Sequence, residues 1–415
     1  MVNPLSADIP SSSPSSACVR CGACMAVCPL YDLLGRETVV ARGKLNLWDL
    51  YQAGGVASKE RLREVLECCL LCGACTEKCA VGLAVPDLIK GARAELRVRE
   101  GWKWSPALVL AYLAWQSPHL LPALAPLAPV INRLKSRVGR ESGLAYRLWP
   151  HLAWGLQGLP DLSPVPFRSQ APRHLPGRGK VKIAFFVGCG IEAFFPRAGQ
   201  AFLAICQHLG IEVVIPPDQG CCGLLSESVG ERDLARTQGR QMVQEFAALP
   251  VDFVVTACAS CSYQLKRLGV LLDGTPEARA GASLAAKVKE ASEFLVQVAG
   301  YRPDLRQLPA EVAFHDPCHL HRGQGIIQEP RELLAAATGR EAPQPRELVC
   351  CGQGGAFGVL YPEISRGLGA ARTQAHRQKG AQILATSCTG CLVQLRQTAD
   401  NLRVVHLLEL VGPVT

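Results

Sequence analysis

The chain has 415 residues, of which 48% are hydrophobic and 19% are charged, and this composition excludes an intrinsically disordered protein. A net charge of +9 is mild for this length and only 6% of the residues are aromatic, so no nucleic-acid partner is expected. The unusual number is 20 cysteines. Residues 1–17 lack the apolar core of a secretory signal. We therefore predict a disordered tail, a reducing cytoplasmic location and metal-bound thiolates in place of disulfides.

The cysteines divide the chain into three blocks. Residues 18–100 hold nine of them, 101–179 hold none, and 180–415 hold the other eleven. Within the second block, residues 104–132 carry no Asp, Glu, Lys or Arg, but prolines limit their Pro-free runs to 11 residues, too short to cross a bilayer. We predict a helical connector and linker over 101–179. Contact of 104–132 with a membrane surface, at the inner face of the cell membrane, or with a partner protein stays open.

The third block contains an internal repeat, whose copies are named CCG units after their Cys-Cys-Gly segments. Each copy has one single cysteine, the Cys-Cys-Gly segment and a Cys-x-x-Cys pair, and the copies keep offsets of 129 or 130 residues. This register indicates a duplication, with the first unit at 180–300 and the second at 301–415. The predicted metal ligands are Cys189, Cys221, Cys222, Cys258 and Cys261 in the first unit, and Cys318, Cys350, Cys351, Cys388 and Cys391 in the second.

Both units alternate short apolar segments with amphipathic ones. Strands are expected at 181–188, 211–216, 252–257, 312–316, near 347–351 and at 382–387, and helices at 197–209, 231–247, 330–338 and 362–379. Such alternation predicts α/β layers with largely parallel strands, in which sites gather at the carboxyl ends of the strands. We therefore expect the cysteines to converge at one edge of each unit. The predicted fold class is α+β and multi-domain, with an N-terminal α-helical two-cluster ferredoxin-type domain, the connector and two duplicated α/β CCG units.

The first block contains two cysteine runs with the spacing of bacterial ferredoxins. In such runs the fourth cysteine binds the neighbouring cluster. The predicted ligands are therefore Cys18, Cys21, Cys24 and Cys79 for 4Fe-4S cluster one, and Cys69, Cys72, Cys75 and Cys28 for 4Fe-4S cluster two. Structural zinc is the alternative, but two runs with this spacing are typical of iron–sulfur proteins. Ala80 replaces the usual proline of the second run without removing a ligand, and Cys68 is expected to be a buried bystander.

Several cations lie near these ferredoxin cysteines in the sequence. They are able to balance the negative charge of a thiolate-bound cluster and raise its potential. For most of them a solvated surface position is the expected alternative. The set is Arg20, Arg36, Arg42, Lys44, Lys78, Lys90 and Arg93.

Each CCG unit offers five thiolates, one more than a tetrahedral zinc or a cubane needs. Gly223 and Gly352 permit the turn that would let the cysteine pair bridge one extended cluster or bind two metals. The glycine-rich segment 352–358 lacks the nucleotide-binding register, so we expect its backbone to approach a cluster. His315, His319 and His321 flank Cys318, either for proton delivery or metal binding or as hydrogen-bonded structural histidines.

Residues 17–45, the two CCG units and the tail VVHLLELV resemble the iron–sulfur subunit family of glycolate oxidase and D-lactate dehydrogenase. The layout, two ferredoxin motifs followed by two CCG units, is also similar to that of a heterodisulfide reductase component. Glycolate subunits often lack the first cysteine of the Cys-x-x-Cys pair, whereas this chain keeps Cys258 and Cys388. The resemblance therefore implies two 4Fe-4S clusters, with one or two further non-cubane clusters, or zinc, at the CCG units.

No catalytic triad, phosphate-binding loop or flavin fingerprint is apparent, so no flavin is expected on this chain. The resemblance implies an electron-transfer subunit of a flavin-dependent 2-hydroxy-acid (glycolate or D-lactate) dehydrogenase, an oxidoreductase component. Its partners would be an FAD-containing dehydrogenase subunit and a quinone or another acceptor. The alternative is a disulfide reductase acting at CCG-bound clusters, with His315, His319 and Cys318 as catalytic candidates. A redox-inert zinc scaffold is a third hypothesis.

Overall fold

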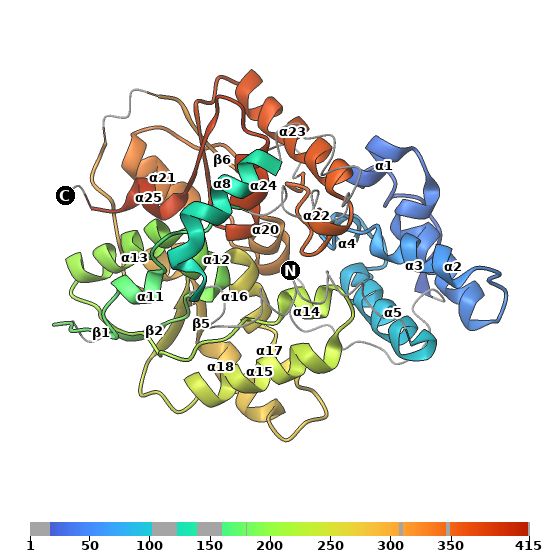
Figure 1. The fold of residues 1–415 in the computed structure, drawn as a ribbon, viewed down its shortest axis with the longest axis horizontal. Coiled ribbons are helices and arrows are strands. Elements are labelled where there is room, and N and C mark those ends of the chain that lie inside the picture. The colour runs from blue at the N-terminus through green and yellow to red at the C-terminus, as the bar shows by residue number, and fades with distance from the viewer. Residues whose placement is uncertain are drawn as a thin grey trace.

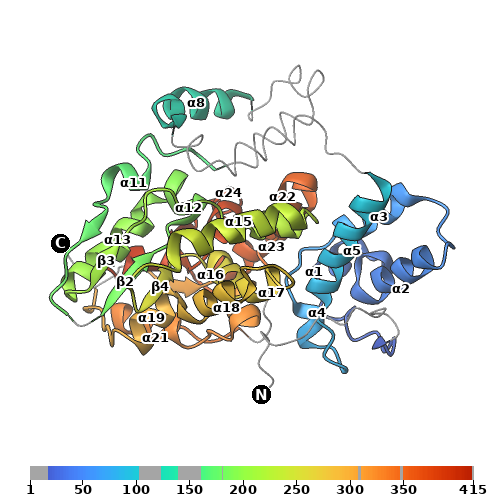
Figure 2. The same cartoon turned by 90° about the horizontal axis from the view of Figure 1, so that it is seen from below.

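The computed structural model describes residues 17–101, 123–138, 160–179, 181–306, 310–345 and 349–413. All but the last residue of the predicted disordered tail, and most of the predicted connector, lie outside these ranges. Figures 1 and 2 show helices α1 to α5 grouped beside a larger body that contains both sheets. Helix α8 (Ala128–Val138) lies on the outside of that body. Among the described residues, no helix has both the length and the apolar character that a membrane span requires.

The N-terminal group is entirely helical in its regular structure, as predicted. Its helix α3 begins where the Ser58 side chain accepts a hydrogen bond from the Arg61 amide, and α5 ends at Gly101 in the left-handed conformation. Trp48, Leu66 and Ile89 are buried together between the helices. The elements are α1 (Pro29–Leu34), the 3₁₀ helix η2 (Glu37–Val39), α2 (Ala41–Gln52), α3 (Lys59–Glu67), α4 (Ala74–Glu77) and α5 (Val85–Glu100).

The first CCG unit contains a five-stranded sheet in the order β1-β3-β2-β4-β5. All neighbouring strands are parallel except β1 and β3, and Ile183 on β2 pairs with Val213 on β3 and Phe253 on β4. The strands are β1 (His174–Leu175), β2 (Lys182–Phe185), β3 (Glu212–Val214), β4 (Phe253–Thr256) and β5 (Val288–Glu290). The helices are α11 (Phe167–Gln170), α12 (Gly188–Ala193), α13 (Pro196–His208), α14 (Leu224–Ser228), α15 (Arg232–Phe246), α16 (Ala259–Leu265), α17 (Leu268–Leu271), α18 (Ala278–Lys287) and α19 (Ala291–Gln297).

The second CCG unit has a three-stranded parallel sheet in the order β6-β7-β8, with Ala313, Leu384 and Val404 in register. The strands are β6 (Val312–Phe314), β7 (Ile383–Thr386) and β8 (Arg403–His406). The helices are α20 (Cys318–Gln324), α21 (Glu329–Thr338), α22 (Phe357–Leu360), α23 (Pro362–Gln378), α24 (Thr389–Gln397) and α25 (Leu407–Val411).

One strand expected in the second unit is missing from the part of it that the structure describes. Residues 349–351 belong to no strand, and 346–348 lie outside the described ranges, so the prediction near 347–351 was wrong for its described residues. The preceding Pro343 and Pro345 lack the N–H group that a sheet ladder needs. The other predicted strands and all four predicted helices are present, with shorter strands.

The two units share their hydrophobic core. One buried cluster joins Phe185 and Phe202 of the first unit to Leu333 and Leu408 of the second. The Phe185 and Phe202 rings lie 4.8 Å apart between centroids. His406, at the end of β8, also hydrogen-bonds through Nε2 to the Ala257 carbonyl, just beyond β4, at 2.8 Å. The carboxyl ends of the two sheets are therefore held beside each other.

Candidate metal centres

The single cysteines and the Cys-x-x-Cys pairs lie just beyond the carboxyl ends of strands. Cys189 follows β2 on α12, and Cys318 follows β6 as the first residue of α20. Cys258 follows β4 as the N-cap of α16, and Cys388 follows β7 as the N-cap of α24. This repeated arrangement places equivalent cysteines at equivalent points of two parallel sheets.

The Cys-Cys-Gly segments form tight turns. Gly223 has φ 87° and Gly352 has φ 96°, conformations that favour glycine. A Cβ atom on Gly352 would lie 2.8 Å from both the Leu368 Cβ and the Ser365 carbonyl oxygen, so a larger residue does not fit. The Gly352 amide lies 3.5 Å from the Cys350 sulfur, and the Gly223 amide lies at the same distance from Cys221. The turns therefore hold the cysteine pairs in position.

Within each unit the predicted ligands meet. In the first unit Cys189 hydrogen-bonds to Cys221, and Cys261 hydrogen-bonds to both Cys222 and Cys258. The second unit repeats the pattern: Cys318 hydrogen-bonds to Cys350, and Cys391 hydrogen-bonds to both Cys351 and Cys388. Cys221 also hydrogen-bonds to Cys222, and Cys350 to Cys351, so the five cysteines of each unit form one connected group, as the repeat predicts.

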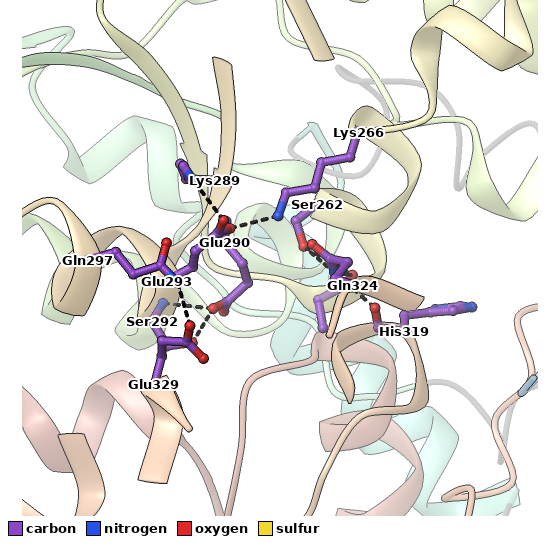
Figure 3. Close-up of polar contacts among 11 residues, drawn as sticks. Ser262, Lys266, Lys289, Glu290, Ser292, Glu293, Gln297, His319, Gln324 and Glu329 are labelled. Carbon is purple, nitrogen blue, oxygen red and sulfur yellow. Dashed lines mark hydrogen bonds and ion pairs between the residues drawn. The ribbon is translucent and has the colours of Figure 1, made fainter. Parts of the chain in front are cut away.

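The two groups also touch each other. Cys258 of the first unit hydrogen-bonds to Cys388 of the second, and its sulfur lies 3.1 Å from the Thr389 hydroxyl. Gln324 ties α20 to α16, since its amide donates to the Ser262 hydroxyl at 2.9 Å and to the Ala259 carbonyl at 3.1 Å. Figure 3 shows Gln324 between Ser262 and His319, with the His319 ring pointing away from it. Hydrogen bonds therefore hold the two units together at this junction.

The second cysteine run of the ferredoxin-type segment adjoins the second unit. Cys72 hydrogen-bonds to Cys350, and this contact, followed by burial, raises the pKa of the Cys72 thiol well above its usual value. Cys28 interacts electrostatically with Cys72 and Cys69. Cys75 interacts electrostatically with Cys28, Cys69 and Cys72. The predicted ligands of cluster two are thus neighbours. For cluster one, Cys18 and Cys24 both lie near Arg42, and the grouping with Cys21 and Cys79 stays a prediction.

The glycine-rich segment lies against this junction. A Cβ atom on Gly354 would lie 2.8 Å from Leu70, and one on Gly355 would lie 2.9 Å from the Ser228 hydroxyl. A cavity of about 10 Å³ lies between Gly354, Cys69 and their neighbours. This cavity is too small for a nucleotide. The segment therefore makes a close backbone approach, here to the cysteine-bearing loop of the ferredoxin-type part.

Three of the cations near the ferredoxin cysteines are buried. Lys44 is 1% exposed, and Lys90 and Arg93 are 6% exposed. The Lys44 ammonium donates to the Thr38 carbonyl at 3.2 Å and interacts electrostatically with Cys69. Lys44 and Arg93 therefore both lie beside Cys69, a predicted ligand of cluster two. Arg20, Arg36 and Lys78 are exposed, which fits the surface alternative.

The three histidines near Cys318 differ in their surroundings. His319 stacks on Tyr263, with centroids 4.7 Å apart, and its Nδ1 lies 3.0 Å from the Ser260 hydroxyl. His321 lies 3.4 Å from the Asp316 carboxylate. His315 is 3% exposed, and among the described residues its Nε2 has no hydrogen-bond partner. Burial lowers the pKa of His315 and of His319 to about 4, so both rings are neutral at pH 7.

Most of the buried thiols are weak acids when no metal is present. Burial raises the pKa of Cys28 to about 11, and contact with Cys258 raises that of Cys388 to about 12. A bound cation is the usual means of deprotonating such a group, since a coordinated thiol loses its proton. This donor set of buried cysteine sulfurs suits soft metals and iron–sulfur clusters.

Comparison with known proteins agrees with this arrangement. A family model of the 4Fe-4S dicluster domain matches residues 14–83, and a model of the cysteine-rich CCG domain matches 183–266 and 312–396. Lactate utilization protein A of Geobacillus thermodenitrificans (strain NG80-2) is 32% identical over 238 residues, which are 56% of this chain and 99% of that protein. The chain belongs to the family of glycolate oxidase and lactate utilization iron–sulfur proteins.

Two further relatives can be aligned with almost the whole chain. The probable glycolate oxidase iron–sulfur subunit of Bacillus subtilis (strain 168) is 29% identical over 419 residues, which are 95% of this chain and 92% of that protein. A component of the fumarate reductase (CoM/CoB) of Methanothermobacter marburgensis is 27% identical over 423 residues, with 95% and 71% covered. The resemblance stated from the sequence is confirmed, and the chain is an oxidoreductase component.

Three features of this family member had no signal in the sequence. The contact of Cys72 with Cys350 joins residues far apart in the chain. Nothing in the sequence around Ser260 marks it as functional, yet its hydroxyl lies 3.2 Å from the Cys388 sulfur. The burial of Lys44 likewise depends on tertiary packing. The position of Ser260 between the cysteines of a Cys-x-x-Cys pair does not by itself indicate a contact with the other unit.

Proposed function

We propose that this chain is the iron–sulfur electron-transfer subunit of a flavin-dependent dehydrogenase that oxidises glycolate or D-lactate. It would pass electrons from an FAD-containing subunit to a quinone or another acceptor. The names of its relatives support the substrate class, since they refer to glycolate oxidase and lactate utilization. Its free cysteines support a reducing cytoplasmic location.

The observation that carries this proposal is the succession of contacting cysteines from the second ferredoxin run through both CCG units. Cys72 touches Cys350 in the second unit, and Cys388 of that unit touches Cys258 in the first. Bound iron–sulfur clusters would supply one-electron carriers at these sites. The chain's own role is to hold neighbouring ligand sets in contact and to bury them. Short separations and exclusion of water are what an electron-transfer path requires of the protein.

A reconstituted complex tests the proposal. The chain, purified without oxygen, is mixed with its flavoprotein partner and either D-lactate or glycolate, and cluster reduction is followed by electron paramagnetic resonance. Rapid reduction with one of these substrates, and none without the flavoprotein, is expected. Cys72→Ala should block electron passage to the CCG units. Cys206→Ala is the matched control, because Cys206 is a fully buried thiol outside the repeat pattern. Failure of both substrates to reduce the chain would refute the proposal.

The second candidate is reduction of a disulfide at the CCG units. It is favoured by the complete set of five cysteines in each unit and by a polar chain that reaches one of them. His319 Nδ1 contacts the Ser260 hydroxyl at 3.0 Å, which contacts the Cys388 sulfur at 3.2 Å. Such a chain is suited to delivering a proton to a departing thiolate. In this case the reduced chain alone would consume a disulfide, and Cys388→Ala would abolish turnover while the N-terminal clusters persist.

A surface contact of the connector is part of the first proposal. Leu127 and Val130, within the segment 104–132, are 54% and 64% exposed. A contiguous exposed apolar patch is suited to a partner surface or a membrane surface, and these two side chains would contribute to one. Sedimentation with lipid vesicles, with and without the flavoprotein, separates the two. Binding to neither would remove this part of the proposal.

A further inference from the structure

His315 of the second CCG unit faces the sulfurs of that unit. A ring nitrogen of His315 and the sulfurs of Cys351 and Cys391 all lie within 4.8 Å of one another. All three residues are buried, and the imidazole is 3% exposed. Its Nε2 finds no hydrogen-bond donor or acceptor in the part of the chain that the structure describes. A buried polar atom without a partner is costly, and a ligand beside it is the simplest explanation.

The groups around His315 do not supply that partner. The adjacent Asp316 carboxylate is held by Arg331 through two bonds of 2.8 and 2.7 Å and also lies beside His321. His376 packs edge-on to His315 with centroids 6.3 Å apart, which is a ring contact and not a hydrogen bond. The imidazole is therefore oriented by packing, with a nitrogen left toward the cysteines.

The first unit has a different residue at the same place. Phe186 stands 129 residues before His315, and the two have the same backbone position. The Phe186 amide donates to the Val255 carbonyl at 2.8 Å, and the His315 amide donates to Ala385, the equivalent of Val255, at 2.8 Å. A Cβ atom on Gly188 would lie 3.3 Å from the Phe186 ring and 3.1 Å from the Cys261 sulfur, so this ring too lies near its unit's cysteines.

The duplicated scaffold thus presents a carbon ring to one cysteine group and an imidazole to the other. Phenylalanine offers no lone pair, whereas neutral imidazole binds iron and zinc. A role confined to packing would not require a nitrogen, since the phenylalanine of the first unit fills the equivalent space. The difference between the units therefore indicates a role for the imidazole nitrogen of His315 beside the second cysteine group.

We propose that His315 is a metal ligand of the second CCG site, so that this site holds its metal with mixed nitrogen and sulfur donors while the first site uses sulfur alone. The inference rests on the proposed binding of metal at the CCG units, but not on the flavoprotein or its substrate. Where neutral imidazole takes the place of one of the five thiolates at the metal, the ligand set is less negative, which raises the reduction potential of an iron–sulfur centre. The second site would then accept an electron more readily than the first.

The test measures nitrogen directly at the metal. Chain purified without oxygen, with and without ¹⁵N-labelled histidine, is reduced and its paramagnetic centres are examined by pulsed electron paramagnetic resonance. One centre should show a nitrogen coupling that changes with the label. If metal analysis finds zinc at this site, X-ray absorption at the zinc edge should show nitrogen at about 2.0–2.1 Å beside sulfur at about 2.3 Å. These measurements on the unaltered protein do not depend on the folding of a variant.

Three variants complete the design. His315→Phe, which copies the first unit, should abolish the nitrogen signal and lower the metal content of the second site. His315→Cys should keep the metal, lose the nitrogen signal and show a lower potential. His376→Phe is the matched control and should leave both readouts unchanged. The proposal fails if the unaltered protein shows no histidine nitrogen at any metal, or if the signal survives in both His315 variants. Failure of the flavoprotein to reduce the chain would leave the nitrogen signal intact, so the two proposals fail separately.

Discussion

The hydroxyl of Ser260, in the first CCG unit, lies 3.2 Å from the sulfur of Cys388 in the second. The same hydroxyl lies 3.0 Å from Nδ1 of His319. When that nitrogen carries the ring proton, His319 donates to Ser260, and the serine proton is left to donate to the sulfur. A residue of one unit thereby donates a hydrogen bond to a predicted ligand of the other.

Ser260→Ala should therefore lower the reduction potential of the second CCG site. A hydrogen bond to a ligand sulfur stabilises the reduced, more negative centre, and its loss removes that stabilisation. The expected shift is on the order of tens of millivolts, since about 59 mV corresponds to a tenfold change for one electron. A redox titration followed by electron paramagnetic resonance measures it.

Ser262→Ala is the matched control for this change. Ser262 is a buried serine on the same helix, but its hydroxyl bonds to the Ala259 carbonyl and receives the Gln324 amide. Ser262→Ala should therefore destabilise the junction by about 1 kcal/mol without changing the reduction potential of the second CCG site. Equal shifts in the two variants would show that the Ser260 effect is only structural.

The regular elements of the CCG units were largely predictable because their signals are local. The helices expected at 197–209 and 231–247 occur as α13 and α15, since amphipathic periodicity and flanking breakers define them within the segment itself. The three-residue strand β5 has no apolar run and could not be recognised. It forms because Val288 finds Val254 on β4 as a parallel neighbour.

The convergence of the cysteines was predictable from the sequence, whereas the contacts between the cysteine groups were not. Spacing and repetition pointed to the cysteines, and the turns at Gly223 and Gly352 followed from them. The contact between Cys72 and Cys350 depends on how the ferredoxin-type helices dock on the second unit. No short segment of the sequence indicates how these parts dock, because the contact joins residues far apart in the chain. The same reason explains why buried and exposed cations near the cysteines could not be separated beforehand.

Cys68 should prove dispensable for metal binding. It is 7% exposed, packs in the core and stands beside the predicted ligand Cys69. Cys68→Ala should keep the full iron content and cost about 1 kcal/mol of stability for the lost buried volume. Cys69→Ala should instead lose cluster two. Iron and sulfide analysis of both variants decides, and loss of iron in Cys68→Ala alone would reverse the ligand assignment.

Glu290 should make the stability of the first unit depend on pH. It is 1% exposed and caps α19 through the Ser292 amide at 2.7 Å, and burial raises its pKa to about 7 (Figure 3). The folded state therefore keeps a proton that the unfolded state loses near pH 4.5. Stability should fall as pH rises between these values, by about 2 kcal/mol from pH 5.5 to 8, and then level off.

Glu290→Gln should remove this pH dependence, as measured by thermal unfolding at several pH values. Glu293→Gln is the neighbouring control. Glu293 pairs with Lys266 and Lys289 at 2.7 Å each, and these partners hold its pKa below the usual value despite burial. Its stabilisation is lost only as pH falls below about 4.5, so this variant should keep most of the slope between pH 5.5 and 8, reduced by the part that the Glu293 charge contributes to the raised pKa of Glu290. A slope that persists in Glu290→Gln would contradict the role given to that carboxyl.

Arg93 should be the residue on which the docking of the ferredoxin-type helices depends most. Its guanidinium donates to the carbonyls of Leu66 and Cys69, at 2.7 and 3.0 Å, and to that of Ser228 in the first CCG unit. Arg93→Met would leave these buried carbonyls without a donor, at about 3 kcal/mol or more. Thermal unfolding should move to lower temperature, and cluster two should lose iron first because the Cys69 backbone is released.

Arg99 provides the comparison on the same helix. It is half-exposed and pairs with Glu95 one turn away, so Arg99→Met should change stability by no more than about 0.5 kcal/mol and leave the iron content unchanged. Because both variants remove one positive charge from α5, a general effect of charge would affect them equally. Equal behaviour of the two would therefore show that the carbonyl contacts of Arg93 do not hold the interface. A large difference, with early loss of iron in Arg93→Met, would show that they do.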